Sequence, residues 1–301
     1  MKIAIVGSGG RLGAALMREY QDKFDVLGFN HAQLDLADAA DIHRKIDQLD
    51  FDVLINAAAM TNVDLCESQR AEAFQINAEA PRLLAEICAQ KNAKLIHIST
   101  DYVFDGEKRE PYLEDDAAKP ISIYGESKRA GESNVLAVQD RHLVLRISWV
   151  FGPDRPSFID GVIKRALENE KVEAVADKFS APTYTRDLGE MLPRLFDVDL
   201  ATGRVRPDGG LAGGLLHFAN AGECSWQEYG QHALDCCDAL GLPLKTRSVA
   251  PLKLSDIKQF VARRPVYTVL STAKFAALTG TEPRSWRDAL TDYIECSYLK
   301  K

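Results

Sequence analysis

A glycine-rich turn near the start of the chain is the feature that most limits the possible folds. The apolar run KIAIVG before it predicts a short buried strand, and RLGAALMREYQ after it has the apolar spacing of a helix. The turn places Gly7, Gly10 and Gly13 in the pattern G-x-x-G-x-x-G. Such a turn can hold a dinucleotide pyrophosphate on backbone N–H groups at the helix N-terminus, although a plain tight turn is the alternative.

Strands and helices keep alternating through the first half of the chain. Short apolar segments predict four further strands at 25–30, 52–59, 94–100 and 142–148. Helical patterns fill the intervals, and Pro81 is expected to disturb the long helical stretch 71–91. This alternation predicts an α/β fold, a Rossmann-type doubly wound parallel sheet with helices on both faces.

The alternation loosens after residue 150, which divides the chain into two expected units. Residues 1–150 are expected to form an NAD(P)-binding Rossmann domain. Residues 151–301 are expected to form mainly a smaller C-terminal substrate-binding cap, with later segments returning to the sheet unit. The glycine-rich segment 202–214 is expected to be an exposed loop.

Composition narrows the class of partner. The 301 residues carry a formal net charge of −7, which argues against nucleic acid or an anionic membrane but not against a small anionic ligand. The chain does not start with a cationic segment followed by a long apolar one. The six cysteines and six histidines lack metal-ligand spacing, so no metal is expected, and reduced thiols in a cytoplasmic protein are the simplest interpretation.

The expected nucleotide site, for NADPH or NADH, extends beyond the glycine turn and its Leu12. The second strand ends at Asn30, where NAD enzymes usually have a carboxylate, and Arg11 either faces a 2′-phosphate or begins the helix in solvent. Asp35 and Leu36 suit the edge and face of an adenine, or a polar loop residue beside a core leucine. NADPH is therefore expected to be accepted at least as well as NADH.

Small residues follow the third strand. Ala57, Ala58 and Ala59, with Thr61 close behind, allow a cofactor to lie against the strand end, although alanines also serve tight helix packing.

Two further groups of polar residues have the types and spacing of a catalytic site. Thr100, Asp101 and Tyr102 follow the next strand, where a hydroxyl can bond a substrate oxygen or cap a helix. Tyr124 and Lys128 are four residues apart, so a helix would place the phenol and the ammonium on one face. The spacing alone is common in helices, and its meaning depends on the residues around it.

Eight segments recur together in one known family. They are GSGGRLG, NAAAMTNVDLCES, HISTDYVFDG, YGESKRAGE, RISWVFG, DKFSAPT, HFANAGECSWQEY and RRPVYTVL. In this order they resemble the extended short-chain dehydrogenase/reductases over nearly the whole chain. S-T-D-Y-V-F-D-G and R-x-S-W-V resemble the subgroup that reduces nucleotide-linked 4-keto-6-deoxysugars. The resemblance implies an NAD(P)H-dependent oxidoreductase, a nucleotide-sugar substrate and a possible homodimer.

The resemblance also assigns roles to individual residues. It implies that Tyr124 donates a proton to the carbonyl oxygen and that Thr100 orients the substrate carbonyl. Lys128 would lower the pKa of the phenol and hold the nicotinamide ribose. Asp101 and Tyr102 are expected to contact the substrate.

Two more features are expected at the substrate. Trp149 follows a strand that leads into the cap, so it is either a wall of the substrate pocket or a core aromatic residue. Arg263 and Arg264 could bind the sugar-linked diphosphate or form surface salt bridges, and Arg263 is the one that we predict to bind substrate.

Departures from the family pattern leave the exact sugar nucleotide open. Lys178, Ser180 and Thr268 stand where glutamine, glycine and serine are usual. A sibling sugar-nucleotide dehydratase or epimerase is one alternative, but dehydratases carry Thr-Asp-Glu where this chain has Tyr102. The other alternative is a non-catalytic NADP-binding subunit resembling the regulatory subunit of methionine adenosyltransferase, which lacks the S-W-V sequence found here at Trp149.

Overall fold

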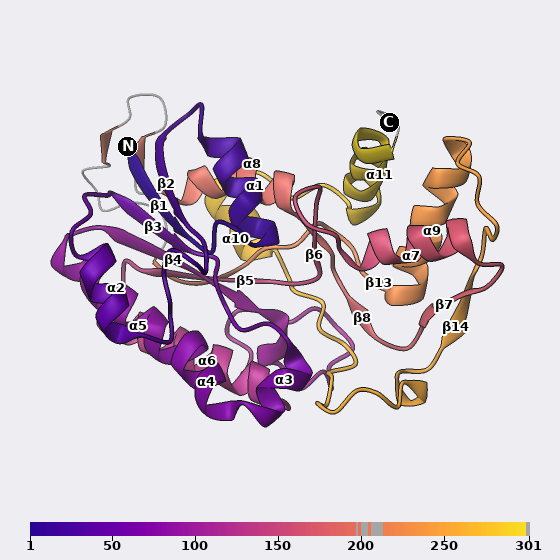
Figure 1. The fold of residues 1–301 in the computed structure, drawn as a ribbon, viewed down its shortest axis with the longest axis horizontal. Helices are drawn as coiled ribbons and strands as arrows, with labels where there is room; N and C mark the ends of the chain where they lie inside the picture. Colours follow the sequence, from indigo (N-terminus) through magenta and orange to yellow (C-terminus); the bar gives the residue numbers. More distant parts are fainter. Residues whose placement is uncertain (197, 200–203, 206–212, 299–301) are drawn as a thin grey trace.

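A six-stranded parallel sheet lies at the centre of the molecule (Figure 1). The computed structural model describes residues 1–196, 198–199, 204–205 and 213–298. The strand order is β12-β5-β4-β3-β1-β2, and every neighbouring pair is parallel. The strands are β1 (Lys2–Val6), β2 (Asp25–Phe29), β3 (Val53–Asn56), β4 (Lys94–Thr100), β5 (Leu143–Ile147) and β12 (Gly214–His217). The predicted doubly wound parallel sheet is confirmed.

Helices cover both faces of this sheet (Figure 1). One face carries α2 (Ala39–Ile46), α5 (Ala80–Gln90) and α6 (Ile123–Val138), and the other carries α1 (Arg11–Tyr20), α8 (Thr185–Met191) and α10 (Ala273–Thr279). Alternate residues of β1 enter two separate cores, Ile3 and Ile5 on the α1 side and Ala4 and Val6 on the α2 side. Burial of both faces explains why the strands are apolar almost throughout.

The long helical stretch at 71–91 is interrupted, as Pro81 led us to expect. It consists of α4 (Arg70–Phe74), a π-helical turn at Gln75–Glu79 and then α5, preceded by the short helix α3 (Val63–Ser68). Pro81 lies in the first turn of α5, where a missing N–H breaks no bond of that helix. The irregularity therefore falls just before the proline, in the π-helical turn.

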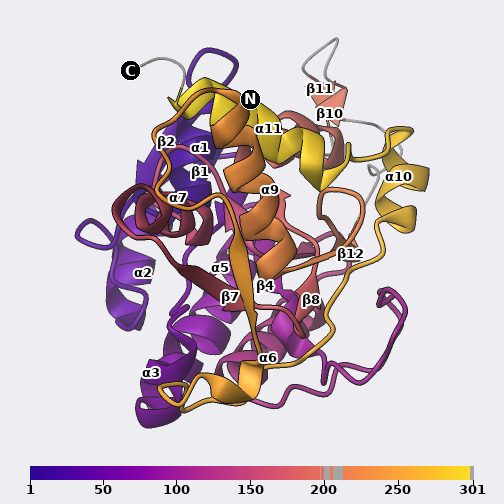
Figure 2. The same ribbon diagram turned by 90° about the vertical axis from the view of Figure 1, so that its right-hand side faces the viewer.

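A smaller lobe, which we call the cap, packs around its own apolar core (Figure 2). Its helices are α7 (Phe158–Glu168), α9 (Trp226–Ala239) and α11 (Trp286–Tyr298). Its short strands are β6 (Val150–Phe151), β7 (Val172–Val175), β8 (Phe179–Ser180), β9 (Thr183–Tyr184), β13 (Cys224–Ser225) and β14 (Val249–Leu252). Capping boxes begin both α7 and α9, so each start is fixed locally by a serine and an acid three residues later.

Three segments of the second half pack with the sheet unit. They are α8, α10 and β12, and β12 pairs with β5 as the edge strand. The first residues of LLHFAN belong to β12, so this part of the second half extends the main sheet. The predicted loop 202–214 lies largely outside the described residues. Within it, β11 (Arg204–Val205) pairs with β10 (Val198–Asp199), and Gly214 begins β12.

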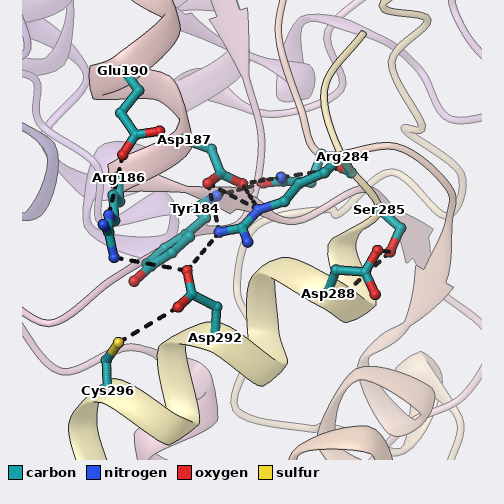
Figure 3. Close-up of polar contacts among 10 residues, drawn as sticks. Tyr184, Arg186, Asp187, Glu190, Arg284, Ser285, Asp288, Asp292 and Cys296 are labelled. Atoms are coloured by element: carbon teal, nitrogen blue, oxygen red, sulfur yellow. Dashed lines mark hydrogen bonds and ion pairs between the residues drawn. The ribbon is translucent and has the colours of Figure 1, made fainter.

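An arginine ties the cap to the sheet unit (Figure 3). Arg284 donates to both carboxylate oxygens of Asp187, the shortest contact being 2.7 Å, and at 2.8 Å to Asp292. Asp187 lies on α8 and Asp292 on α11, so one guanidinium joins helices of the two lobes.

Within the described residues, no group of three or more histidine, cysteine and acidic side chains could hold a metal. No helix there is long and apolar enough to cross a membrane.

A buried ion pair fixes α6 to the sheet. Arg146 on β5 donates two bonds of 2.7 Å to the carboxylate of Glu132 on α6, and both side chains are at most 1% exposed. Ser99, near the end of β4, donates to the same carboxylate at 2.6 Å. The pair therefore connects one helix with two neighbouring strands.

Removing the charge of Glu132 should strongly destabilise the fold. In Glu132→Gln, Arg146 would stay buried without its counter-ion, and we expect the free energy of unfolding to fall by about 3–5 kcal/mol. Urea denaturation measures this change. Glu86→Gln, which removes half of an exposed pair with Arg82, is the matched control and should change stability by about 0–1 kcal/mol. A loss in Glu132→Gln no larger than the control would contradict a structural role for the pair.

Candidate active site

The switch point of the sheet brings two predicted segments together. The chain leaves β1 for β2 on one side and later returns to place β3 on the other, so a crevice is expected at the carboxyl ends of β1 and β3. The glycine turn follows β1, and Ala57 to Ala59 follow β3. A Cβ added to Gly7 would lie 2.7 Å from the backbone nitrogen of Ala58. The two segments are thus in direct contact, as a shared nucleotide site requires.

The glycine turn fits a dinucleotide pyrophosphate. A Cβ on Gly13 would lie 2.1 Å from the Gly7 carbonyl oxygen, so only glycine permits this tight approach. Gly10 is the N-cap of α1 and offers no side-chain acceptor to the first N–H groups of the helix. Those groups and the helix dipole suit an anion.

Other residues predicted for the nucleotide site take part in local structure. The side-chain oxygen of Asn30 accepts two backbone N–H groups of its own turn, at 3.0 and 3.1 Å. The carboxylate of Asp35 likewise accepts a backbone N–H two residues on. Leu36 and Leu12 are buried in the cores on opposite faces of the sheet, and Thr61 is exposed. The predicted contacts of Asp35 and Leu36 with an adenine stay predictions.

Arg11 begins α1, as one of its two interpretations expected, but its guanidinium bonds the protein. Its guanidinium donates to the carbonyl oxygens of Arg155, at 3.2 Å, and of Pro156. In return, Arg155 donates from Nε to the carbonyl of Gly9 at 3.0 Å. These reciprocal contacts, which we call the arginine clasp, join the glycine turn to the cap loop between β6 and α7. Sequence reasoning missed them because the partners lie 144 positions apart.

The helix α6 carries Tyr124 and Lys128 on one buried face, as their spacing predicted. Ser122 caps the helix by accepting the Gly125 N–H at 3.2 Å. A Cβ on Gly125 would lie 2.3 Å from the carbonyl oxygen of Tyr102, so the glycine lets the helix approach the end of β4. Tyr124 is 9% exposed and Lys128 is 1% exposed.

The side-chain amine of Lys128 is buried and contacts residues of β4. Its Nζ donates to the Ile98 carbonyl at 2.7 Å and lies 3.3 Å from Nε2 of His97. Burial lowers the pKa of Lys128 to about 8, although the charge of Glu132 opposes this shift. The other ring nitrogen of His97 lies 3.2 Å from the Asn56 amide. A polar chain thus runs from the end of β3 to Lys128.

The expectation that Lys128 lowers the pKa of Tyr124 differs from the structure. Burial raises the pKa of Tyr124 above its ordinary value, and a hydrogen bond with Thr100 opposes the shift only in part. Lys128 donates instead to the Ile98 carbonyl. The phenol therefore keeps its proton at neutral pH, and Thr100 is beside it as predicted.

Asp101 is positioned to orient other residues. It is 2% exposed, and its Oδ1 accepts from the Thr100 hydroxyl at 3.1 Å. Its Oδ2 accepts from Ser180 at 3.2 Å and from Thr268 at 2.5 Å. Both carboxylate oxygens of Asp101 are thus engaged with the protein, and its predicted contact with substrate stays a prediction.

The three departures from the family pattern meet around Asp101. Ser180 and Thr268 donate to it, and Lys178 interacts electrostatically with it. Lys178 is fully buried, donates to the Pro265 carbonyl at 2.5 Å and lies 5.0 Å from the centre of the Tyr102 ring. Burial lowers the pKa of Lys178 to about 8.

This lowered pKa predicts a pH-dependent contribution of Lys178 to stability. Between about 8 and its ordinary value of 10.5, the unfolded state binds a proton that the folded state does not, so stability rises with pH. Below pH 8 both states are protonated and the term is constant. Relative to Lys178→Gln, the wild type should therefore gain stability from pH 8 to 10 by up to about 1.4 kcal/mol per pH unit. Denaturant titrations of both proteins across this range test it, and a pH-independent difference would contradict the lowered pKa of Lys178.

A cavity of about 210 Å³ lies between the glycine turn and the cap. Arg11, Trp149, Phe158, Trp226 and Tyr229 are among its lining residues. Among the described residues, the Trp149 Nε1 and the Tyr229 hydroxyl are buried polar atoms without a hydrogen-bond partner. Trp149 is among the residues that line this cavity, which is the position expected of a pocket wall.

The consecutive residues Arg263 and Arg264 differ in their surroundings. Arg264 forms two bonds with the carboxylate of Asp64, at 2.6 and 3.0 Å, and stacks over Phe260. It therefore matches the salt-bridge interpretation. Arg263 is exposed, and its predicted contact with substrate stays a prediction.

Sequence reasoning did not single out Phe158, Trp226 or Tyr229. Trp226 and Tyr229 are three positions apart in SWQEY, which places them on one face of α9 and could have indicated an aromatic site. Phe158 begins α7 and stacks on Tyr229 with ring centres 6.1 Å apart. Nothing in its sequence context reveals this contact.

The fold and the site together define the class of the protein. A doubly wound parallel sheet, a glycine turn at its switch point and a Tyr-x-x-x-Lys helix beside it are the features of an extended short-chain dehydrogenase/reductase. The chain belongs to the RmlD substrate binding domain family, whose model matches residues 1–298.

Named relatives and solved structures agree with this assignment. The dTDP-4-dehydrorhamnose reductase of Mycolicibacterium smegmatis is 37% identical over 97% of this chain and 85% of that protein. A dTDP-4-dehydrorhamnose reductase of Clostridium acetobutylicum superposes with a TM-score of 0.88 at 30% identity, covering 98% of this chain and 99% of the other. The reductase of Bacillus anthracis in complex with NADP gives 0.86 at 30% identity, covering 97% and 98%.

Proposed function

We propose that the protein is an NAD(P)H-dependent reductase that converts dTDP-4-dehydro-L-rhamnose to dTDP-L-rhamnose. The observation that carries the proposal is the convergence of Thr100, Tyr124 and Lys128 at the ends of β4 and α6. The names of the relatives give the substrate class, and the NADP complex of one of them gives the cofactor. We also propose that the protein is cytoplasmic and forms a homodimer. Light scattering would test the homodimer.

The proposed site lies between two units. Residues 1–150, with the returning segments α8, β12 and α10, form the nucleotide unit, and the rest of 151–301 forms the cap. The bound nicotinamide supplies a hydride to the keto carbon. The residues proposed to hold the cofactor are Gly7, Gly10, Arg11, Leu12, Gly13, Asn30, Asp35, Leu36, Ala57, Ala58, Ala59, Thr61, Tyr124 and Lys128. For Arg11 and Leu12 this role falls to the backbone, because their side chains are engaged elsewhere.

Tyr124 acts as the general acid. A phenol is protonated at neutral pH even at its ordinary pKa of about 10, so a proton is available as negative charge develops on the substrate oxygen. Thr100 orients that oxygen, and Asp101 fixes the Thr100 hydroxyl from behind. Lys128, buried below with a pKa of about 8, provides a cation near the phenolate that the transfer leaves.

The sugar nucleotide occupies the cleft between the units. Trp149 and Tyr229 line the cavity, where their aromatic rings can pack against the sugar. Tyr102 lies edge-on to the catalytic ring, with centres 5.7 Å apart. Arg263 is exposed on the segment that leads to Pro265 and is proposed to bind the diphosphate.

Replacing the proposed acid should abolish most turnover. NADPH oxidation with dTDP-4-dehydro-L-rhamnose tests the function itself, and Tyr124→Phe should reduce kcat by about 10² to 10⁴ while NADPH affinity is nearly unchanged. If the wild-type protein binds NADPH but reduces no keto sugar nucleotide, the non-catalytic alternative gains support. Full activity in Tyr124→Phe would mean that another group delivers the proton.

Removing one hydroxyl should reveal the substrate pocket. Tyr229→Phe deletes a buried group without a partner, so stability should stay equal or rise by up to about 1 kcal/mol, whereas KM for the sugar nucleotide should rise several-fold. Tyr293→Phe is the matched control, because that hydroxyl donates to Asp160 at 2.5 Å. It should lower stability and leave KM unchanged. Thermal melting and steady-state kinetics measure both, and an unchanged KM in Tyr229→Phe would remove this residue from the pocket.

A further inference from the structure

We propose that Arg155, on the cap loop between β6 and α7, binds the 2′-phosphate of NADPH and so sets the choice between NADPH and NADH. The inference rests on the proposed function, because it concerns the same nucleotide site. It differs from one of the two sequence expectations for Arg11, in which that residue faces the 2′-phosphate.

The position of Arg155 beside the end of β2 is the first step. In dinucleotide-binding sheets, the residue about 20 positions after the glycine turn lies at the adenosine ribose. That residue is Asn30 here. A Cβ added to Gly9 would lie 3.2 Å from the Asn30 Cβ and 4.0 Å from a terminal guanidinium nitrogen of Arg155. The guanidinium therefore lies next to the expected position of the ribose. It lies beside Gly9, which has no side chain to occupy the space between them.

Charge is the second step. Asn30 replaces the usual ribose-binding carboxylate, so no negative side chain at this position opposes a phosphate. Arg155 is exposed and bonds the Gly9 carbonyl through Nε, and no ion pair is found for it among the described residues. The terminal nitrogens of a guanidinium form the planar fork that suits a phosphate group.

Preorganisation is the third step. The two bonds from Arg11 to the carbonyls of Arg155 and Pro156 hold the backbone of the cap loop against α1. Arg18, farther along α1, pairs with Asp154 of the same loop. Arg11 thus acts as a positioning residue, since its guanidinium fixes the loop that presents Arg155.

Equilibrium titration of the full-length protein tests the proposal without relying on turnover. Nucleotide fluorescence gives the Kd of NADPH and of NADH for the wild type, Arg155→Gln and Arg155→Lys. We expect Arg155→Gln to weaken NADPH binding about 10- to 100-fold, the effect of losing charge-assisted hydrogen bonds, and to change NADH binding less than about twofold. Arg155→Lys should recover part of the NADPH affinity. Competition by 2′,5′-ADP should weaken in parallel.

A matched control removes a charge elsewhere in the cap. Arg165 is exposed on α7 and can be changed to Gln with the same loss of charge. It should leave both dissociation constants unchanged, and thermal melting of each variant checks that the fold is intact. An equal loss of NADPH and NADH affinity in Arg155→Gln would overturn the proposal, because it would indicate a contact with the shared pyrophosphate or a purely structural clasp. Unchanged NADPH affinity would overturn it as well.

The outcomes also separate this proposal from the function on which it rests. If the wild type binds both nucleotides and reduces the sugar substrate, but Arg155→Gln shows no selective loss, only the role of Arg155 fails. If the wild type binds neither nucleotide, the proposed reductase fails together with the role of Arg155.

Discussion

The buried pair of Glu132 and Arg146 is the interaction on which the geometry of the site depends. It fixes α6 against β5, and the Ser99 hydroxyl extends it to β4. The proposed acid and the buried lysine lie on that helix, and Thr100 lies one residue after Ser99, so one carboxylate sets the relative position of all three. If two apolar side chains of similar volume replaced the pair, the fold could be equally stable. Apolar contacts have no preferred direction, so they would not fix the orientation of α6 relative to the strands in the same way. The pair therefore serves the register between helix and strands.

The nucleotide site is built jointly by both lobes. The arginine clasp connects the glycine turn to the cap loop, and Arg284 makes a second connection between α8 and α11. Because the clasp lies at the first turn of α1, displacement of the cap loop would alter the surface that faces the nucleotide. The cavity lined by Trp149 and Tyr229 borders the same loop. In the proposed function, cofactor and substrate would therefore be held by neighbouring parts of one interface between the lobes.

Local patterns explain which parts of this structure could be predicted from the sequence. The strand–glycine–helix start and the i, i+4 relation of Tyr124 and Lys128 are encoded by short spacings, and both appear as expected. Later segments were expected to return to the sheet unit, but the sequence did not identify β12 as one of them, because its four residues give no indication of their partner. The direction of Arg11 was missed for the same reason, since its acceptors come from a distant cap loop. Burial of Asp101 likewise depends on hydroxyls that only the fold brings together.

The surroundings of Asp101 show why changes at several positions belong together. A buried carboxylate needs donors, and two of the three hydroxyls that bond it come from residues that depart from the family pattern. The third departure, Lys178, places a buried amine in the same electrostatic environment, where the carboxylate favours its charged form and burial opposes it. Lys178 also lies against the ring of Tyr102, which in turn meets the ring of Tyr124. The departures therefore form one connected group behind the ring of Tyr124. In the proposed reaction their effect would pass through Thr100 and Tyr102, and no direct contact with the sugar would be required.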